Sequence, residues 1–398
     1  MPSFLTFLAA YVLSQFFRSF LAVIAPELGA ELMLDSQDLG NLQAFWIGGF
    51  VIMQLPVGYA LDHVGPRRTI AVLMLAAIAG ALLFAAARSA FALNVAMVLI
   101  GIGCSAIYMG AIYVFGRIYQ QQRFALLCSW LIGIGSAGNL LAATPLAFAA
   151  EAIGWRMAMV AIAAATALSA LSIFLLIRDP PRAVAPSSAG VFSGLGEIIA
   201  MKSLWPLLPL TAVGYSVVLS ERGLWAGPYF AEVFELGPVD RGNALLLMAA
   251  TMSLGAMVYG PLDRLFGTRK WIVAAGSLIA ALCFIALGMA NPSLPWAIAL
   301  IALLGAFGMT YGVLMAHGRA LFPDHLLGRG ITFLNLLFIG GAGIMQPLSG
   351  AMMSRTTGTP DESYAVLHIA FGIALLAALA IYLFSREDRT ALQTAKKP

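Results

Sequence analysis

The sequence predicts an all-α polytopic membrane protein with 12 transmembrane helices, built as two six-helix bundles. Three observations predict this class: the composition, the recurrence of long apolar runs, and a second half that repeats the first. Of 398 residues, 61% are hydrophobic and only 10% are charged, far from the balance of a soluble domain. One span takes about 20 apolar residues, so the chain has room for about twelve spans and no sizeable soluble domain.

Apolar runs bounded by charges and turn residues mark the spans. Between the sixth and seventh runs, residues 178–203 are rich in Ala, Pro, Ser and Gly and are predicted to be a cytoplasmic linker. We therefore expect an N-terminal bundle over 1–177, a C-terminal bundle over 204–385 and a cytoplasmic tail over 386–398. The predicted spans are 4–28, 39–61, 69–87, 90–115, 124–149, 155–177, 204–231, 242–262, 271–290, 295–316, 328–353 and 364–385.

The orientation follows from the distribution of the 22 Lys and Arg residues. Sixteen lie in one set of alternate loops, in the linker or in the C-terminal tail, whereas the opposite loops hold only Arg88, Arg156, Arg241 and Arg355. Because cytoplasmic loops carry the excess of Lys and Arg, both termini are predicted to be cytoplasmic in a multi-pass protein of the cell (inner) membrane.

The internal repeat is visible as matched residues 202 positions apart. Gly and Ala are abundant, so single matches of these types mean little, but Pro, Asn and Arg matches at one offset are hard to obtain by chance. They indicate two copies in parallel orientation. The matches include Pro26/Pro228, Asn41/Asn243, Gly65/Gly267, Arg67/Arg269, Arg117/Arg319 and Pro145/Pro347.

The loops after the second and eighth spans carry a common motif. The first loop reads Gly-Tyr-Ala-Leu-Asp-His-Val-Gly-Pro-Arg-Arg over 58–68, and the second reads Gly-Pro-Leu-Asp-Arg-Leu-Phe-Gly-Thr-Arg-Lys over 260–270. With twelve spans and a central linker, this resembles the GxLaDrxGxRR signature of the major facilitator superfamily over essentially the whole chain.

This resemblance implies that the motif is a conformational latch which couples the two halves during alternating access. Glycines permit tight turns and close helix approach, and a carboxylate can accept from helix N-terminal N–H groups or pair with an arginine. The alternative is that these charges only fix the topology. The latch residues that we expect are Gly58, Asp62, Gly65, Arg67, Arg117, Asp263, Gly267 and Arg269.

Arg18 lies in the middle of the first span, and Arg222 lies in the first span of the second half. An arginine at the bilayer centre costs about 2.5 kcal/mol or more, so we expect each to face the protein interior or a wet cavity. Each follows a tyrosine by seven residues, Tyr11 and Tyr215, and seven residues are close to two helical turns, so each pair would share a face. Two guanidiniums in one cavity would repel unless an anion bridged them.

We therefore expect a small anionic substrate. The arginine pair is similar to that of the organophosphate/phosphate antiporters of the superfamily, which place an arginine in the first helix of each half, and nitrate and organic-acid porters also bind anions through arginines. Other polar residues at membrane depth could line the cavity or serve only as helix-packing contacts. The lining that we expect comprises Tyr108, Tyr311, Asn139 and Asn335.

Glu221 is a carboxylate placed well inside a predicted span, and it is the candidate for proton coupling. An alternative for Arg222 is a structural ion pair with Glu221, Glu232 or Glu235. Adjacent residues on a regular helix point about 100° apart, so Glu221 and Arg222 would pair only if the helix were distorted. Gly223, Gly227 and Pro228 favour such a distortion.

The function expected is secondary active transport of a small, anionic solute by alternating access, driven by protons or by exchange for a counter-anion. A proton-driven drug exporter is an alternative, although the fifth span lacks the Gly-Pro pair typical of those proteins; a transporter-derived sensor or intramembrane enzyme is another. The histidines and cysteines form no metal-ligand spacing, and no nucleotide-binding motif occurs. We expect a monomer in the lipid bilayer, with no catalytic residues, no cofactor, no metal and no nucleic-acid partner.

Overall fold

The computed structural model describes residues 2–118, 127, 130–179, 195–289, 292–323 and 326–387, and within these ranges the secondary structure is helical, without strands. The chain divides into two compact units. Unit 1 comprises Met1–Ser187, Gly223–Ala231 and Glu235–Leu246, and unit 2 comprises Ser188–Arg222, Glu232–Phe234 and Leu247–Pro398. Two short segments from the second half of the sequence therefore group with the first half.

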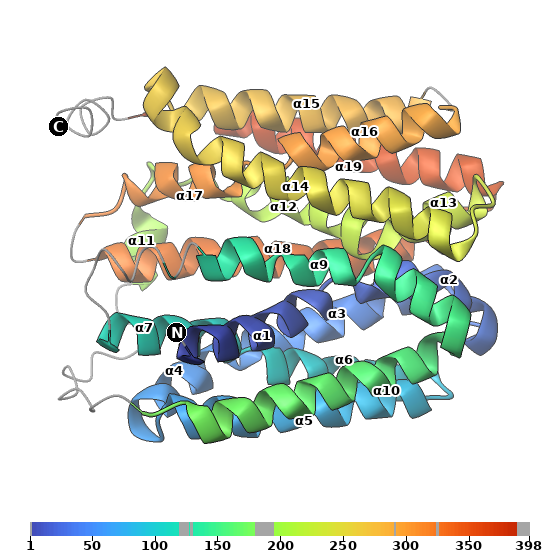
Figure 1. The fold of residues 1–398 in the computed structure, drawn as a ribbon. Helices are drawn as coiled ribbons and strands as arrows, with labels where there is room; N and C mark the ends of the chain where they lie inside the picture. The colour runs from blue at the N-terminus through green and yellow to red at the C-terminus, as the bar shows by residue number, and fades with distance from the viewer. Residues whose placement is uncertain are drawn as a thin grey trace. The chain divides into compact units, whose positions relative to one another are not determined.

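Helices of the first half pack against one another in several close pairs. In Figure 1, α5 runs beside α10 and α6, and α3 packs against α6. The first-half helices are α1 (Pro2–Phe16), α2 (Phe20–Leu32), α3 (Ser36–Ile52), α4 (Gln54–His63), α5 (Pro66–Ala86), α6 (Ala90–Cys104), α7 (Ile107–Ile118), α9 (Ala137–Leu141) and α10 (Thr144–Leu176).

The second half repeats this pattern, with α15 beside α19 and α12 beside α18 (Figure 1). Its helices are α11 (Leu195–Ala200), α12 (Leu208–Ser220), the π-helix η1 (Glu221–Trp225), α13 (Ala226–Glu232), α14 (Pro238–Phe266), α15 (Lys270–Met289), α16 (Leu294–Phe307), α17 (Tyr311–Arg319), α18 (Leu327–Met353) and α19 (Pro360–Tyr382).

Eight helices in the described part of the chain are long and apolar enough to cross a membrane, or nine if the bent pair of α1 and α2 forms one span. This is fewer than the twelve predicted spans because several of those are interrupted or joined. The span expected at 39–61 breaks at Met53, between α3 and α4, and the span expected at 204–231 is interrupted by η1. The fifth and sixth spans meet in α10, where Gly154 adopts a non-helical φ of 80°.

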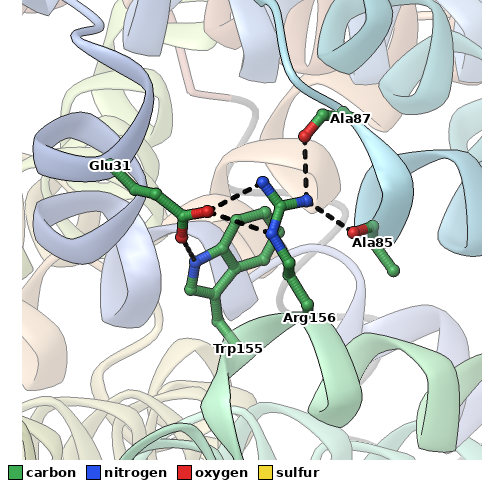
Figure 2. A network of polar contacts seen from close by, with 5 residues as sticks. All are labelled: Glu31, Ala85, Ala87, Trp155 and Arg156. Carbon is green, nitrogen blue, oxygen red and sulfur yellow. Dashed lines mark hydrogen bonds and ion pairs between the residues drawn. The ribbon is translucent and has the colours of Figure 1, made fainter.

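An ion-pair network joins α2, α5 and α10 at the end predicted to face outward (Figure 2). Arg156 donates from Nη2 to Oε1 of Glu31 at 2.8 Å, and from Nη1 to the carbonyls of Ala85 and Ala87 at 2.6 and 2.8 Å. The indole of Trp155 donates to Oε2 of Glu31 at 2.7 Å. The carbonyls at the C-terminal end of α5 lack helical partners, so Arg156 both satisfies them and ties three helices together.

Close contact between α3 and α6 depends on glycine. A Cβ at Gly101 of α6 would overlap the carbonyl oxygen of Trp46, and a Cβ at Gly49 of α3 would lie 2.5 Å from the carbonyl oxygen of Val98. Small residues at such interfaces let helix backbones approach closely in a membrane. The result is that Trp46 is held with its side chain only 3% exposed, in the neighbourhood of the break between α1 and α2.

Candidate functional site

Arg18 lies in a break between α1 and α2 rather than in a continuous helix. The two helices form a bent pair with an angle of 42° between them. At the break the backbone N–H groups of Arg18 and Ser19 bond to the carbonyls three residues earlier, Gln15 and Phe16, at 3.3 and 3.0 Å. Gln43 of α3 donates from Nε2 to the Arg18 carbonyl at 3.1 Å. A side chain from another helix thus stabilises the irregular backbone.

The guanidinium of Arg18 lies over two aromatic rings of α3. Its Cζ is 5.4 Å from the ring centroid of Trp46 and 5.0 Å from that of Phe50. These two rings are four residues apart on α3 and stack on one another, with centroids 5.4 Å apart. Cation–π attraction of about 0.5–2 kcal/mol holds the cation in place, and it uses none of the guanidinium N–H groups.

Three polar atoms around this break are shielded from solvent and lack a hydrogen-bond partner within the described ranges: Nε of Arg18, Nε1 of Trp46 and Oε1 of Gln43. An unsatisfied buried donor costs about 1–3 kcal/mol, more when the group is charged. Two of the three atoms can only donate. The site therefore has a positive charge and two donor N–H groups with spare capacity, which is the chemistry that recognises an oxyanion.

The other predicted lining residues of the first half gather near the same break. Ser19 donates to Oδ1 of Asn139 at 2.9 Å, and Gln15 donates from Nε2 to the hydroxyl of Tyr11 at 3.3 Å. The rings of Tyr11 and Tyr108 lie 5.3 Å apart. Tyr11 itself is 7% exposed within an apolar cluster. Its expected shared face with Arg18 assumed a continuous helix, whereas α1 ends at Phe16.

In the second half, Glu221 and Arg222 begin the π-helix η1. The helix is therefore distorted at this point, as the neighbouring glycines and proline favour, and π-helical turns occur frequently at functional sites. Glu221 is 0% exposed and Arg222 is 8% exposed. Nε2 of His368 on α19 lies 3.4 Å from each carboxylate oxygen of Glu221.

Tyr215, Tyr311 and Asn335 lie close together around a further ring, Phe338 of α18, and their role as substrate lining stays a prediction. Tyr215 stacks on Phe338 with centroids 4.5 Å apart, and Tyr311 lies 3.6 Å from Phe338. The Tyr311 hydroxyl donates to Oδ1 of Asn335 at 2.8 Å. Unit 2 thus has its own half-buried group of aromatic and amide side chains.

The expected latch contains a feature that the motif does not reveal. In unit 1, the backbone N–H of Arg67 at the start of α5 donates to Oδ1 of Asp179 at 2.8 Å. Gly65 precedes α5 with φ 100°, and a Cβ there would lie 2.8 Å from the Asp179 carboxylate. Asp179, which follows the sixth predicted span, therefore caps the N-terminus of α5, where the helix dipole favours an anion.

Unit 2 has the same arrangement. Oε1 of Glu387 accepts from the backbone N–H groups of Arg269 and Lys270, the latter at 3.2 Å, and Oε2 accepts from the hydroxyl of Thr268 at 2.7 Å. Gly267 precedes this turn with φ 64°. Burial opposes ionisation of Glu387 and is the largest single effect, yet these hydrogen bonds together lower its pKa.

The remaining motif residues are placed as follows. Arg67 lies over the ring of Phe174 at 4.4 Å, and Arg117 lies over that of Tyr113 at 4.8 Å. Gly58 lies in α4 with open space where a Cβ would be. The side chains of Asp62 and Asp263 fall outside the described part of the structure, so their expected pairing stays a prediction.

The sequence contained weak signals for the residues that were missed. His368 is the one histidine inside a predicted span, and Asp179 and Glu387 each follow an arginine directly after the sixth span of a half. No such signal exists for Phe50 or Phe338, which are single aromatic residues among 24 phenylalanines. Within the described ranges, no three His, Cys, Asp or Glu side chains gather as a metal site would require.

Comparison with known proteins gives the family. The chain matches the model of the Major Facilitator Superfamily over residues 7–258 and 223–398. It is 25% identical over 195 residues to the nitrate/nitrite transporter NrtP of Nostoc punctiforme, covering 47% of this chain and 39% of that protein. It is 26% identical over 376 residues to monocarboxylate transporter 11 of Mus musculus, covering 87% of this chain and 79% of that protein.

Solved structures show the same fold at low identity. A bacterial homologue of the human lysosomal transporter Spinster, in an inward-facing and unoccupied conformation, aligns with TM-score 0.82 and 19% identity over 100% of this chain and 98% of that chain. A D-xylose-proton symporter aligns with TM-score 0.78 and 14% identity over 97% and 98% of the two chains.

Proposed function

This chain belongs to the major facilitator superfamily and is a multi-pass membrane transporter rather than an enzyme, and from that premise we propose that it carries a small anion by alternating access. The observation that carries the proposal is the surroundings of Arg18. A guanidinium held over two rings retains an N–H group that no described residue accepts, beside the unbonded indole N–H of Trp46.

The relatives support an anion as substrate. The nitrate/nitrite transporter and the monocarboxylate transporter are named for small anions with planar oxygen-bearing groups. Guanidinium N–H groups match such oxygens in pairs, and hydrogen bonds to charged groups contribute about 1.5–3 kcal/mol. The Arg18 guanidinium can therefore bind either a nitrate or a carboxylate group. An oxygen atom of the same anion could also accept a hydrogen bond from the indole N–H of Trp46.

We propose that the substrate also contacts residues of the second half, namely Arg222, Tyr215, Tyr311 and Asn335. In the first half, we propose that the residues which help to position Arg18 are Asn139, Tyr11 and Tyr108. Arg222 is buried in a π-helix, and Tyr215 and Tyr311 share one aromatic neighbour. The expectations of cytoplasmic termini, an inner-membrane location and a monomeric state belong to the same proposal. So does the division into six-helix bundles over 1–177 and 204–385.

The test is a thermal-shift screen of purified protein against nitrate, lactate, succinate, inorganic phosphate, glycerol 3-phosphate and the cation tetraphenylphosphonium. A ligand that binds the folded state raises the melting temperature by mass action. We expect at least one anion to do so. Arg18→Ala should weaken its binding on the order of 10- to 100-fold, because a charge-assisted hydrogen bond is lost.

Two matched variants sharpen this screen. Trp46→Phe keeps a smaller aromatic ring at this position and removes the indole N–H, so it should weaken binding by less than Arg18→Ala does. Arg88→Ala removes an arginine from a predicted outer loop and should leave binding unchanged. Stabilisation by the cation alone, or equal anion binding by Arg18→Ala and the unmodified protein, would exclude the proposed site.

A further inference from the structure

Glu221 and His368 form an acid–imidazole pair with no access to solvent. Both side chains are 0% exposed, and Nε2 of His368 is 3.4 Å from Oε1 and from Oε2 of Glu221. The carboxylate belongs to η1 and the imidazole to α19, so the contact joins two helices of unit 2. Ionisable side chains within membrane-spanning segments are unfavourable in free energy, and they usually mark a pathway for ions, protons or substrate.

The pair can bind one proton without leaving an uncompensated buried charge. A lone buried carboxylate is strongly disfavoured in a low dielectric, but an imidazole at hydrogen-bond distance can share a proton with it. Uptake changes the pair from an anionic carboxylate beside a neutral imidazole to a pair of zero net charge. The proton comes from water and is shared between a carboxylate oxygen and Nε2, and no other covalent bond changes.

Two further groups connect this pair with the end of α19 predicted to face outward. Tyr364 precedes His368 by four residues, so it lies one turn nearer the N-terminus of α19 on the same face. Its ring centroid is 6.3 Å from that of His368. The Tyr364 hydroxyl donates to Oε2 of Glu232, the last residue of α13, at 3.3 Å.

Several groups lie near the pair in the described part of unit 2. On α15 the ring of Phe284 lies near the pair, with its centroid 6.2 Å from that of His368. The preceding residue on α12 is Ser220, which is fully buried. Arg222 follows Glu221 in η1 and supplies the nearest basic residue in sequence. Tyr364 and Glu232 lie toward the N-terminal end of α19, as described above.

We propose that Glu221 and His368 are the proton-binding site of this transporter, and that Tyr364 and Glu232 line the path by which the proton enters from the outer end. The proposal rests on the proposed function, since it assigns the coupling ion of the same transport cycle. It makes His368 a functional residue, although the sequence pattern gave it no role, and it selects proton coupling over anion exchange.

Proton binding can be measured without any substrate, by infrared difference spectroscopy of the reconstituted protein while the pH is varied between about 5 and 8, where imidazoles titrate. We expect bands of a titrating carboxylate and imidazole in the unmodified protein. Glu221→Gln, which preserves shape, should remove the carboxylate band and alter the imidazole band, because the hydrogen-bond partner of Nε2 changes from a carboxylate to an amide. His368→Asn should remove the imidazole band.

Glu232→Gln is the matched carboxyl control. It should leave the Glu221 band and its midpoint in place and slow only the rate at which the band appears after a pH jump. Titration spectra of Glu221→Gln and His368→Asn that equal those of the unmodified protein would overturn the proposal. If His368→Asn fails to fold, Glu221→Gln alone decides the outcome through the same spectra.

Transport by proteoliposomes separates this proposal from the anion site, with nitrate and lactate as probes. Glu221→Gln and His368→Asn should lose accumulation of the probe driven by a pH gradient and keep exchange of labelled for unlabelled probe. Accumulation at the unmodified level in both variants would overturn proton coupling at this pair. If the unmodified protein and both variants bind neither probe, while the unmodified protein still shows the infrared titration, the result would count against the proposed anionic substrate and not against the proton site.

Discussion

Glu31 links protonation to stability at the scale of a single residue. Its hydrogen bond from Arg156 lowers the pKa of its carboxyl, so Glu31 is more acidic in the folded protein than in the unfolded chain. The resulting stabilisation is fully present above the unfolded pKa of about 4.3, and it is lost as the pH falls through the folded value.

Replacement of Glu31 by Gln should therefore lower the thermal unfolding temperature at pH 7, and the difference from the unmodified protein should shrink below about pH 4. The measurement is thermal unfolding in detergent across pH. Glu151→Gln, at an exposed position of α10, is the control and should show no such pH-dependent difference. An equal destabilisation by Glu31→Gln at every pH would contradict the linkage.

Single residues were predictable from the sequence where a charge interrupts an apolar run. Arg18, Arg222 and Glu221 stand out for that reason, since each is costly in a bilayer unless it serves a purpose. Their partners were not evident from the pattern, because Trp46, Phe50 and His368 come from other helices, and only His368 carried a weak signal as the one histidine inside a predicted span. Which of 24 phenylalanines meets a guanidinium depends on helix packing, and spacing along the chain does not contain that information.

At the scale of elements, the acids that cap α5 and α15 are a testable pair. Asp179→Asn should increase hydrogen exchange at the first amides of α5, and Glu387→Gln should do so at the first amides of α15, because each removes a charged acceptor from helix N-terminal N–H groups. Mass spectrometry of exchanged peptides measures both. Each variant is the control for the other, and exchange that rises equally at both helices would argue for general destabilisation.

Most of the predicted spans correspond to helices, but most of their interruptions were not predicted. The break at Arg18 contains no proline or glycine, and Pro26 lies inside α2 without ending it. The break is stabilised by Gln43, whose side chain reaches the Arg18 carbonyl from α3. An irregular backbone in a membrane needs such a partner, and the partner is visible only in the folded protein. The distortion at η1 was easier to predict from the sequence, because three nearby glycine or proline residues favour it.

At the scale of the whole molecule, the two halves repeat in scaffold more closely than in chemistry. Asp179 and Glu387 cap equivalent helices, and Gly65 and Gly267 precede them with positive φ. By contrast, Arg18 lies in a break against two rings, whereas Arg222 lies in a π-helix beside a buried acid. The two arginines therefore have different surroundings, and we expect Arg18 to dominate anion affinity.

Unit 1 contains contacts between the two halves of the sequence that the proposed transport cycle would have to break. Residues 223–231 and 235–246 come from the second half of the sequence and group with unit 1. Arg241 forms an ion pair with Glu27 and donates to the Val23 carbonyl at 2.9 Å, while Thr144 donates to Asn243 at 2.8 Å. Parallel-repeat transporters alternate access by movement of one half against the other, so under the proposed function we expect these contacts to break and re-form in each cycle.

A cross-link between Thr144→Cys and Asn243→Cys, in a background without the three native cysteines, should therefore stop transport. Oxidation would hold the contact closed, and uptake of the anion identified by the thermal-shift screen should fall to the background of empty vesicles. Reduction should restore it, since no other bond is changed. Each single cysteine variant, treated with the same oxidant, controls for chemical damage. Unchanged uptake by fully cross-linked protein would mean that Thr144 and Asn243 stay together throughout the cycle, and the movement would then have to occur elsewhere.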